Sequence, residues 1–124
     1  MPIFAVDGTN DLIERYDGWL FPTGRVLSVP ETMDFWRGQH GCTSQKATSL
    51  PHRIAADPTR LLLVEWTGCS AEDAVRLYRV NGGGHHVPSF TPVPDDDWAR
   101  QAGRQNHDIE TIGEFWAFAK RFNH

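Results

Sequence analysis

Three short apolar segments, each followed by turn-forming residues, do most to limit the folds open to this chain. They are Met1–Val6 (MPIFAV), Leu61–Trp66 (LLLVEW) and Ala74–Val80 (AVRLYRV). Segments of this length that are rich in Val, Ile and Leu and bounded by Gly, Asp or Ser are typical of β-strands. The first two are apolar at nearly every position, which indicates a sheet with both faces covered by helices.

Two helices are predicted around these strands. Ser28 is a suitable N-cap, Glu31 fits the first turn, and Gly41 ends the helical pattern. A second helix is expected over Ile109–Phe122, with Asp108 as its N-cap. Its apolar face is predicted to comprise Ile112, Phe115, Trp116, Ala119 and Phe122.

The rest of the chain, residues 10–24, 43–59 and 86–108, is expected to be irregular because it is polar or rich in Pro and Gly. A chain of 124 residues has room for one core. The order of elements therefore predicts one α/β domain of mostly parallel strands with flanking helices.

The net charge of the chain limits the classes of partner that it is expected to bind. The net charge is −4 and the pI is about 5.8, with twelve Lys and Arg spread along the sequence. Nucleic acids and anionic membranes are bound by clustered basic residues, so neither is an expected partner. No apolar stretch approaches the roughly 20 residues of a membrane span. A cationic segment followed by an apolar one, the mark of a signal peptide, does not follow Met1.

The cysteines and histidines do not form a recognised metal-binding or redox motif. Cys42 and Cys69 are not part of a C-x-x-C motif, so neither a zinc site nor a redox-active pair is expected. Composition leaves open whether they are buried thiols or a disulfide, which would indicate an oxidising compartment. The histidines form no H-E-x-x-H, and the aspartates at 95–97 lack the EF-hand spacing. No metal and no other cofactor is expected.

Residues suited to acid–base chemistry follow the first and third predicted strands. The first is followed by Asp7–Asp11 (DGTND) and the third by Gly82–His86 (GGGHH). Because functional groups of α/β sheets gather beyond the carboxyl ends of strands, we expect these loops to meet. A carboxylate that accepts the Nδ1–H of an imidazole orients the ring and leaves Nε2 free to take a proton, as in a hydrolytic triad. The glycines would allow the sharp turn that brings the histidine over the sheet.

Each side of this pairing also has a simpler interpretation. Asp11 could form only an Asx turn, which is common for Asp in loops. His85 could be an ordinary surface residue, and His86 a loop residue without a role. Spatial contact between the carboxylate of Asp11 and the imidazole of His85 would favour the acid–base interpretation.

These motifs, taken together, resemble the C-terminal part of the secreted α/β-hydrolases grouped as polyhydroxybutyrate depolymerases and feruloyl esterases. That family carries H-G-T-x-D with a Tyr-Asp/Gly-Gly stretch, an aromatic helix end with N-G-C, a second cysteine before a strand, G-G-G-H-x-W-P-G, and a final aromatic helix. The corresponding segments here are DGTND (7–11) with YDG (16–18), FW (35–36) with HGC (40–42), Cys69 with VRLYRV (75–80), GGGHHVPS (82–89) and FWAF (115–118). The likeness covers nearly the whole chain.

The resemblance implies a role for each residue that matches the family pattern. Asp11 would be the triad acid and His85 the triad base of a carboxylic-ester hydrolase, with His86 and Val87 beside the substrate. Polyesters or hydroxycinnamoyl esters are the implied substrates. Three positions depart from the pattern: Asp7 replaces a histidine, Val87 a tryptophan and Ser89 a glycine. Asp7 therefore adds a second carboxylate that could compete with Asp11 for the acid role.

The resemblance also implies a Cys42–Cys69 disulfide and a secreted or periplasmic location. It does not extend to the nucleophile, because no serine of this chain lies in G-x-S-x-G. Residues 1–124 are therefore interpreted as a single partial α/β-hydrolase domain that lacks the upstream half with the nucleophile elbow. The alternative is a non-catalytic, truncated binding or accessory module, or pseudoenzyme. In either case an upstream half or a second copy is expected to cover the open sheet edge.

Overall fold

The computed structural model describes residues 1–122. Its main sheet has the strand order β1-β6-β5-β4, formed by Ile3–Gly8 (β1), Val75–Asn81 (β6), Arg60–Thr67 (β5) and Ser44–Ser49 (β4). β1 and β6 are parallel, whereas the other two strand pairs are antiparallel. The protein is thus α/β with a mixed sheet, in place of the mostly parallel sheet expected. The short connection between β4 and β5 leaves no room for a crossover helix, so these two strands pair as a hairpin.

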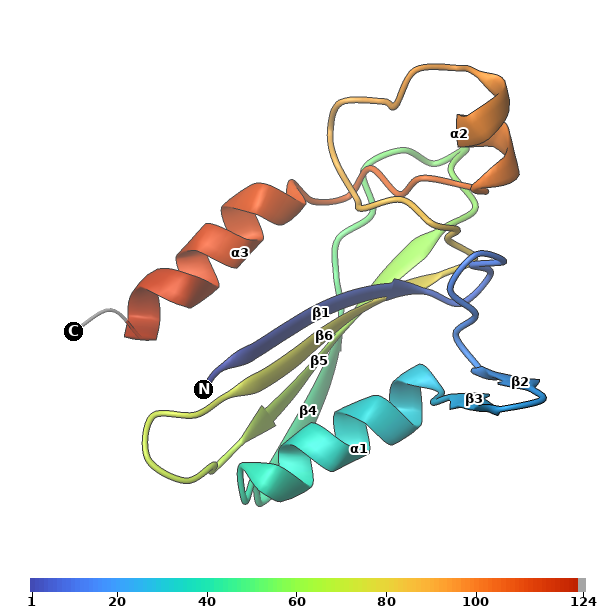
Figure 1. Cartoon of the computed structure of the whole chain (residues 1–124). Helices are drawn as coiled ribbons and strands as arrows, with labels where there is room; N and C mark the ends of the chain where they lie inside the picture. The colour runs from blue at the N-terminus through green and yellow to red at the C-terminus, as the bar shows by residue number, and fades with distance from the viewer. Residues whose placement is uncertain (123–124) are drawn as a thin grey trace.

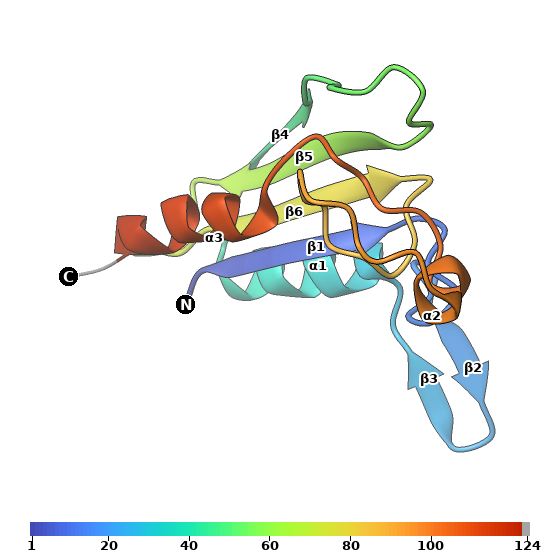
Figure 2. The ribbon, with the colours of Figure 1, turned by 90° about the horizontal axis from the view of Figure 1, so that it is seen from above.

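Two helices cover opposite faces of this sheet, as Figures 1 and 2 show together: α1 (Val29–Gln39) on one face and α3 (Thr111–Ala119) on the other. The predicted start of α1 is confirmed. The Ser28 hydroxyl accepts the amide of Glu31 at 3.2 Å, and the Glu31 carboxylate accepts the amide of Ser28 at 2.8 Å. This capping box fixes the first turn of α1.

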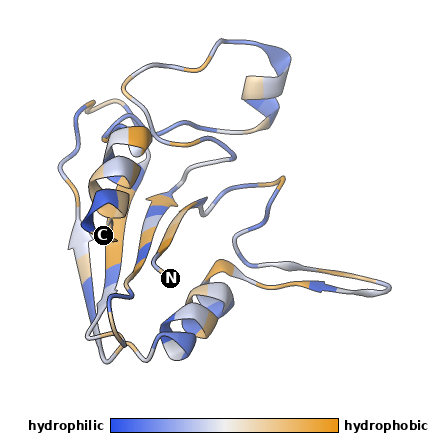
Figure 3. Cartoon of the chain, turned by 60° about the vertical axis from the view of Figure 1, so that its left-hand side comes forward, coloured by the Kyte–Doolittle hydropathy of each residue, from blue (hydrophilic) through white to orange (hydrophobic). Residues whose placement is uncertain are grey.

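The alternation of side chains along the strands divides the core into two clusters. Between the sheet and α1 lie Met33, Val64, Trp66, Val75 and Leu77. On the opposite face lie Leu61, Tyr78, Val80 and Ile109, with Phe4 and Val6 of β1 packed against them. In Figure 3 the hydrophobic colour is concentrated on the central strands, whereas α1 is largely hydrophilic. The expectation of a sheet covered on both faces is confirmed.

The last helix differs from its prediction in its boundaries and in its buried face. α3 begins at Thr111, its N-cap is Glu110, and a short 3₁₀ turn, Lys120–Phe122, follows it. Phe118 is the large side chain that α3 buries, whereas Ile112, Phe115 and Trp116 of the predicted face are exposed. Asp108 does not cap the helix because its carboxylate is occupied by other donors, described below.

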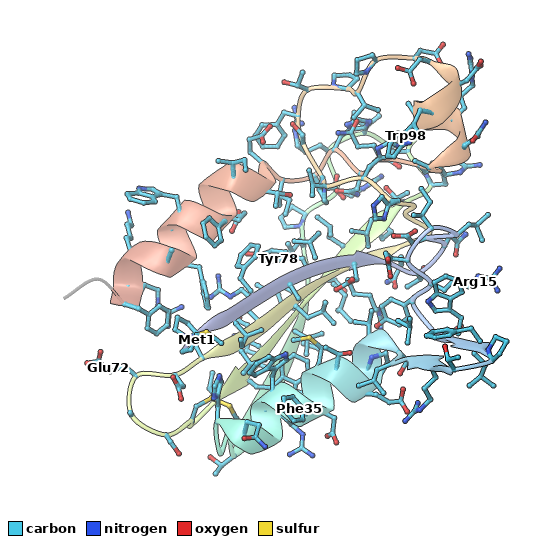
Figure 4. All side chains as sticks on the ribbon, viewed as in Figure 1. Met1, Arg15, Phe35, Glu72, Tyr78 and Trp98 are labelled. Carbon is cyan, nitrogen blue, oxygen red and sulfur yellow. A yellow bond between two sulfur atoms is a disulfide. The ribbon has the colours of Figure 1, made fainter. Side chains whose placement is uncertain are left out.

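The contact between α3 and the sheet includes a partly buried hydrogen bond. The Tyr78 hydroxyl donates to the Glu114 carboxylate at 2.8 Å, and Figure 4 shows Tyr78 on the side of the sheet that faces α3. Burial raises the pKa of Tyr78 to about 12, and the neighbouring Glu114 carboxylate adds to the shift. The hydroxyl therefore remains a donor at physiological pH.

Three segments expected to be irregular contain regular structure. Residues 10–24 contain most of a small hairpin, β2 (Trp19–Phe21) and β3 (Gly24–Val26), which projects from the body in Figure 2. Residues 43–59 contain β4, and residues 86–108 contain α2 (Asp97–Gln101). Each is either short or polar, so the apolar periodicity that marks a buried element is missing.

Cys42 and Cys69 form a disulfide, which confirms the pairing implied by the resemblance. Cys42 follows α1 and Cys69 follows β5, so the bond ties the helix to the sheet at the end where β6 begins. The two loops expected to carry chemistry lie at the other end of β6. Among the described helices, none combines the length and hydrophobicity needed to cross a bilayer.

Candidate functional site

The parallel pairing of β1 with β6 brings the two predicted loops together. Gly8 at the end of β1 lies opposite Val80 in β6. Beyond this pair, the Thr9 amide donates to the Val80 carbonyl at 3.0 Å and the Asn10 amide donates to the Gly83 carbonyl at 2.9 Å. The backbone contacts thus continue from the strands into the loops and hold them side by side.

The glycines allow this close approach. A Cβ atom on Gly8 would lie 2.4 Å from the carbonyl oxygen of Gly83, and one on Gly84 would lie 2.0 Å from the carbonyl oxygen of Ala102. Gly82 has a φ of +81°, in the left-handed region that side chains rarely adopt. The glycine triplet therefore provides a sharp turn and a tight backbone crossing directly before His85.

His85 and Asp11 are in direct contact. Nδ1 of His85 lies 2.7 Å from Oδ2 of Asp11, and since a carboxylate can only accept, the Nδ1–H donates. The other oxygen, Oδ1, accepts the backbone amides of Ile13 and Glu14, each at 2.8 Å. The Asx turn and the contact with histidine, considered above as alternatives, are thus made by different oxygens of one carboxylate.

The two partners differ in exposure in the way that an acid–base pair requires. The Asp11 side chain is 9% exposed and that of His85 is 39% exposed. The His85 amide donates to the Ala102 carbonyl at 2.6 Å, which anchors the residue by its backbone. Within residues 1–122, Nε2 of His85 has no hydrogen-bond partner. The buried carboxylate therefore orients an imidazole whose second nitrogen is free to exchange a proton.

The two aspartates near His85 differ in the direction of their pKa shifts. Burial raises the pKa of Asp11, but hydrogen bonds from His85, Glu14 and Ile13 outweigh burial, and the pKa is lowered. The pKa of Asp7 is raised, first by burial and then by the negative charge of Asp11. Asp11 is thus the carboxylate favoured in its ionised form, and it is the one in contact with His85.

A cavity of about 210 Å³ opens beside the pair. It is lined by Val6, Asp7, Gly8, Asp11, Glu14, Gly84, His85, His86 and Val87. The three carboxylic residues make it acidic. Val87 is exposed at its rim, so both residues that the resemblance places beside a substrate, His86 and Val87, border this cavity.

His86 is held differently from His85. Its Nε2 lies 2.9 Å from the carbonyl oxygen of Ala99 and therefore carries the hydrogen of this bond. Its ring centroid is 5.8 Å from that of Trp98, which is also 6.4 Å from the His85 ring. Sequence reasoning did not single out Trp98, since it lies in a segment with no apolar periodicity.

No serine lines this cavity in the described part of the chain. Ser28 caps α1, and the Ser89 hydroxyl donates to Glu110 at 2.5 Å. Ser44 and Ser49 lie in β4, and Ser70 lies in the turn beside the disulfide. Among the described residues, the cavity is thus lined by a histidine and the carboxylate that orients it, and by no serine.

A second histidine–carboxylate pair, not predicted from the sequence, lies in the loops 50–60 and 104–110. Nδ1 of His52 is 2.9 Å from Oδ2 of Asp108, while Oδ1 of Asp108 accepts the amide of Arg53 at 2.8 Å. The guanidinium of Arg60 lies 2.7 Å from Nε2 of His52. Burial raises the pKa of Asp108, but the bonds from Arg53, Asn106 and His52 lower it overall. No sequence signal marks this pair, because neither residue directly follows a predicted strand.

Within residues 1–122, no group of three or more His, Cys, Asp or Glu side chains is placed to hold a metal ion.

Comparison with protein-family models, with curated proteins and with solved structures finds no match to this chain.

Proposed function

We propose that this chain supplies the base and the orienting acid of a carboxylic-ester hydrolase of the polyhydroxybutyrate depolymerase and feruloyl esterase type. The observation that carries the proposal is the contact between Asp11 and His85, which both line the cavity, while Nε2 of His85 has no hydrogen-bond partner within residues 1–122. The nucleophile is a serine on a segment outside these 124 residues. The fold would then be the C-terminal portion of an α/β-hydrolase.

In the reaction, Nε2 of His85 takes the proton of the serine hydroxyl as its oxygen attacks the ester carbonyl. The imidazolium is stabilised by the buried Asp11 carboxylate and then donates the proton to the leaving alcohol. Water attacks the resulting acyl-enzyme with the same base and releases the acid. Asp11 remains ionised throughout, as its lowered pKa favours.

The free edge of β1 supports the presence of a further segment. Within residues 1–122, β1 has a neighbour on one side only, and both faces of the sheet are covered by α1 and α3. An added strand parallel to β1 would end at the same edge of the sheet as the two loops. Nucleophiles placed after such strands lie near the carboxyl ends of their neighbours.

The test starts with the DNA upstream of Met1, read in frame for G-x-S-x-G. Co-expression of that segment with this chain should give turnover of 4-nitrophenyl butyrate. His85→Ala should lower turnover at least 100-fold and Asp11→Ala by a similar factor. Trp116→Ala, an exposed change on α3, should leave turnover unchanged.

Several results would contradict the proposal. Ester turnover by the joined segments that survives His85→Ala would remove the imidazole from the mechanism. Turnover by the purified chain alone, lost in His85→Ala, would show that the nucleophile lies within these residues. An upstream region without a serine elbow, with no turnover, would favour the alternative of a non-catalytic binding module.

A further inference from the structure

The residue that stands out beside the acid–base pair is Trp98. Its ring centroid is 6.4 Å from that of His85 and 5.8 Å from that of His86, yet the residue is 58% exposed. Figure 4 shows Trp98 on α2, the short helix over the loops that follow β1 and β6. A large aromatic surface is thus open to solvent next to the histidine whose Nε2 is free.

The position of Trp98 is set by contacts with the histidine loop. α2 has five residues, too few to be stable as an isolated helix. The imidazole of His86 donates to the carbonyl of Ala99 at 2.9 Å, and the amide of His85 donates to the carbonyl of Ala102 at 2.6 Å. The loop that orients His85 therefore also holds the indole beside it.

The surroundings of Nε2 combine charge with apolar surface. Asp7, Asp11 and Glu14 line the cavity on one side. Val87 and Trp98 provide exposed apolar surface nearby. The three carboxylic residues repel ligands that carry a carboxylate. An uncharged ligand with a flat apolar group avoids this repulsion and can pack against the apolar surface.

We propose that Trp98 is a specificity-determining residue, whose indole packs against a planar apolar group attached to an uncharged ester carbonyl. His86 is a positioning residue that holds α2, and with it Trp98, beside His85. The inference rests on the proposed function in one respect: that an ester is the ligand that approaches Nε2.

The test uses intact esters as probes, since no serine of the described chain lines the cavity. Methyl benzoate and methyl acetate are titrated into the whole chain, and binding is followed by the NMR signal of the His85 Cε1–H. We expect methyl benzoate to bind roughly three- to ten-fold tighter through aromatic packing. Trp98→Ala should remove this preference, and Trp98→Phe should keep most of it. Trp116→Ala, equally aromatic and exposed but on α3, is the matched control.

The role of His86 is tested with a conservative pair. His86→Ala should bring the ratio of the two affinities, methyl benzoate over methyl acetate, close to one. His86→Gln, whose side-chain amide can still donate to the Ala99 carbonyl, should restore part of the preference for methyl benzoate. Loss of binding of both esters in His86→Ala would show a general structural role and would overturn the positioning role.

The proposal fails if the two esters shift the His85 signal with equal affinity, or if the preference for methyl benzoate survives Trp98→Ala. Its failure can be told apart from failure of the proposed function. A Trp98-dependent preference without turnover in the co-expression assay would reject ester hydrolysis and leave the aromatic binding surface. Turnover that depends on His85 without any such preference would reject the role of Trp98 alone.

Discussion

A double-mutant cycle on Asp11 and His85 would measure the interaction on which the site depends. Asp11→Ala removes an acceptor from two backbone amides and from one imidazole. Loss of the acceptor for the turn costs about 1 kcal/mol, as for a helix cap. The bond to the imidazole contributes about 1 kcal/mol more, a value kept low because His85 is 39% exposed and solvent screens the charges.

We therefore expect the free energy of unfolding to fall by about 2 kcal/mol in Asp11→Ala and by about 1 kcal/mol in His85→Ala. In the double variant it should fall by about 2 kcal/mol. The coupling free energy between the two side chains is then about 1 kcal/mol. Urea unfolding of the four proteins at pH 7 measures each value. A coupling within about 0.3 kcal/mol of zero would refute the contact between them.

The pH dependence of the coupling gives a second measurement. The pKa of Asp11 is lowered in the folded protein, so its carboxylate stabilises the fold above the unfolded-state value of about 3.9. This contribution is lost as the pH falls through the lower, folded-state value. The coupling with His85 should accordingly shrink below about pH 4. The same cycle with Asp7 in place of Asp11 should give a coupling near zero at pH 7, which would settle which carboxylate is the partner.

Three further changes test the surroundings of the site. Asp7→Asn should raise the free energy of unfolding at pH 7, because burial raises the pKa of Asp7 and the folded protein disfavours its charged form. Urea unfolding at a series of pH values should show this gain fading as the pH falls toward 4. Gly84→Ala should cost about 3 kcal/mol by forcing apart two backbone segments, whereas Gly113→Ala, with open space around it on α3, should gain about 0.5–1 kcal/mol. Replacing Cys42 and Cys69 together by serine should lower stability by about 3.5 kcal/mol, the value for a loop with a separation of 27 residues, with an unchanged fold by circular dichroism.

The central strands and the contact between the two loops could be predicted because they follow from local sequence and general topology. The apolar runs that became β1, β5 and β6 have little alternative to a buried sheet. Since functional groups gather after such strands, Asp11 and His85 could be expected to meet. The contact at 2.7 Å agrees with that expectation.

What could not be predicted depends on contacts between distant segments. β4 has the sequence SQKATS and is an edge strand, so it has no apolar signature and owes its strand structure to pairing with β5. α2 is shorter than the window in which helical periodicity can be detected. The place of Trp98 beside His85 depends on the hydrogen bond from the His85 amide to the Ala102 carbonyl, which no local pattern encodes.

The second histidine–carboxylate pair explains why distance alone does not define the site. His52 and Asp108 approach to 2.9 Å, nearly as close as His85 and Asp11 at 2.7 Å. Nε2 of His52, however, lies 2.7 Å from the guanidinium of Arg60 and 3.0 Å from the carbonyl oxygen of Asp57, so this nitrogen is already engaged. That pair joins two loops and has no free nitrogen to exchange a proton with a ligand. His85 has the same carboxylate support, lines a cavity, and has no hydrogen-bond partner at Nε2 within residues 1–122; for this reason we propose acid–base chemistry at the end of β1 and β6.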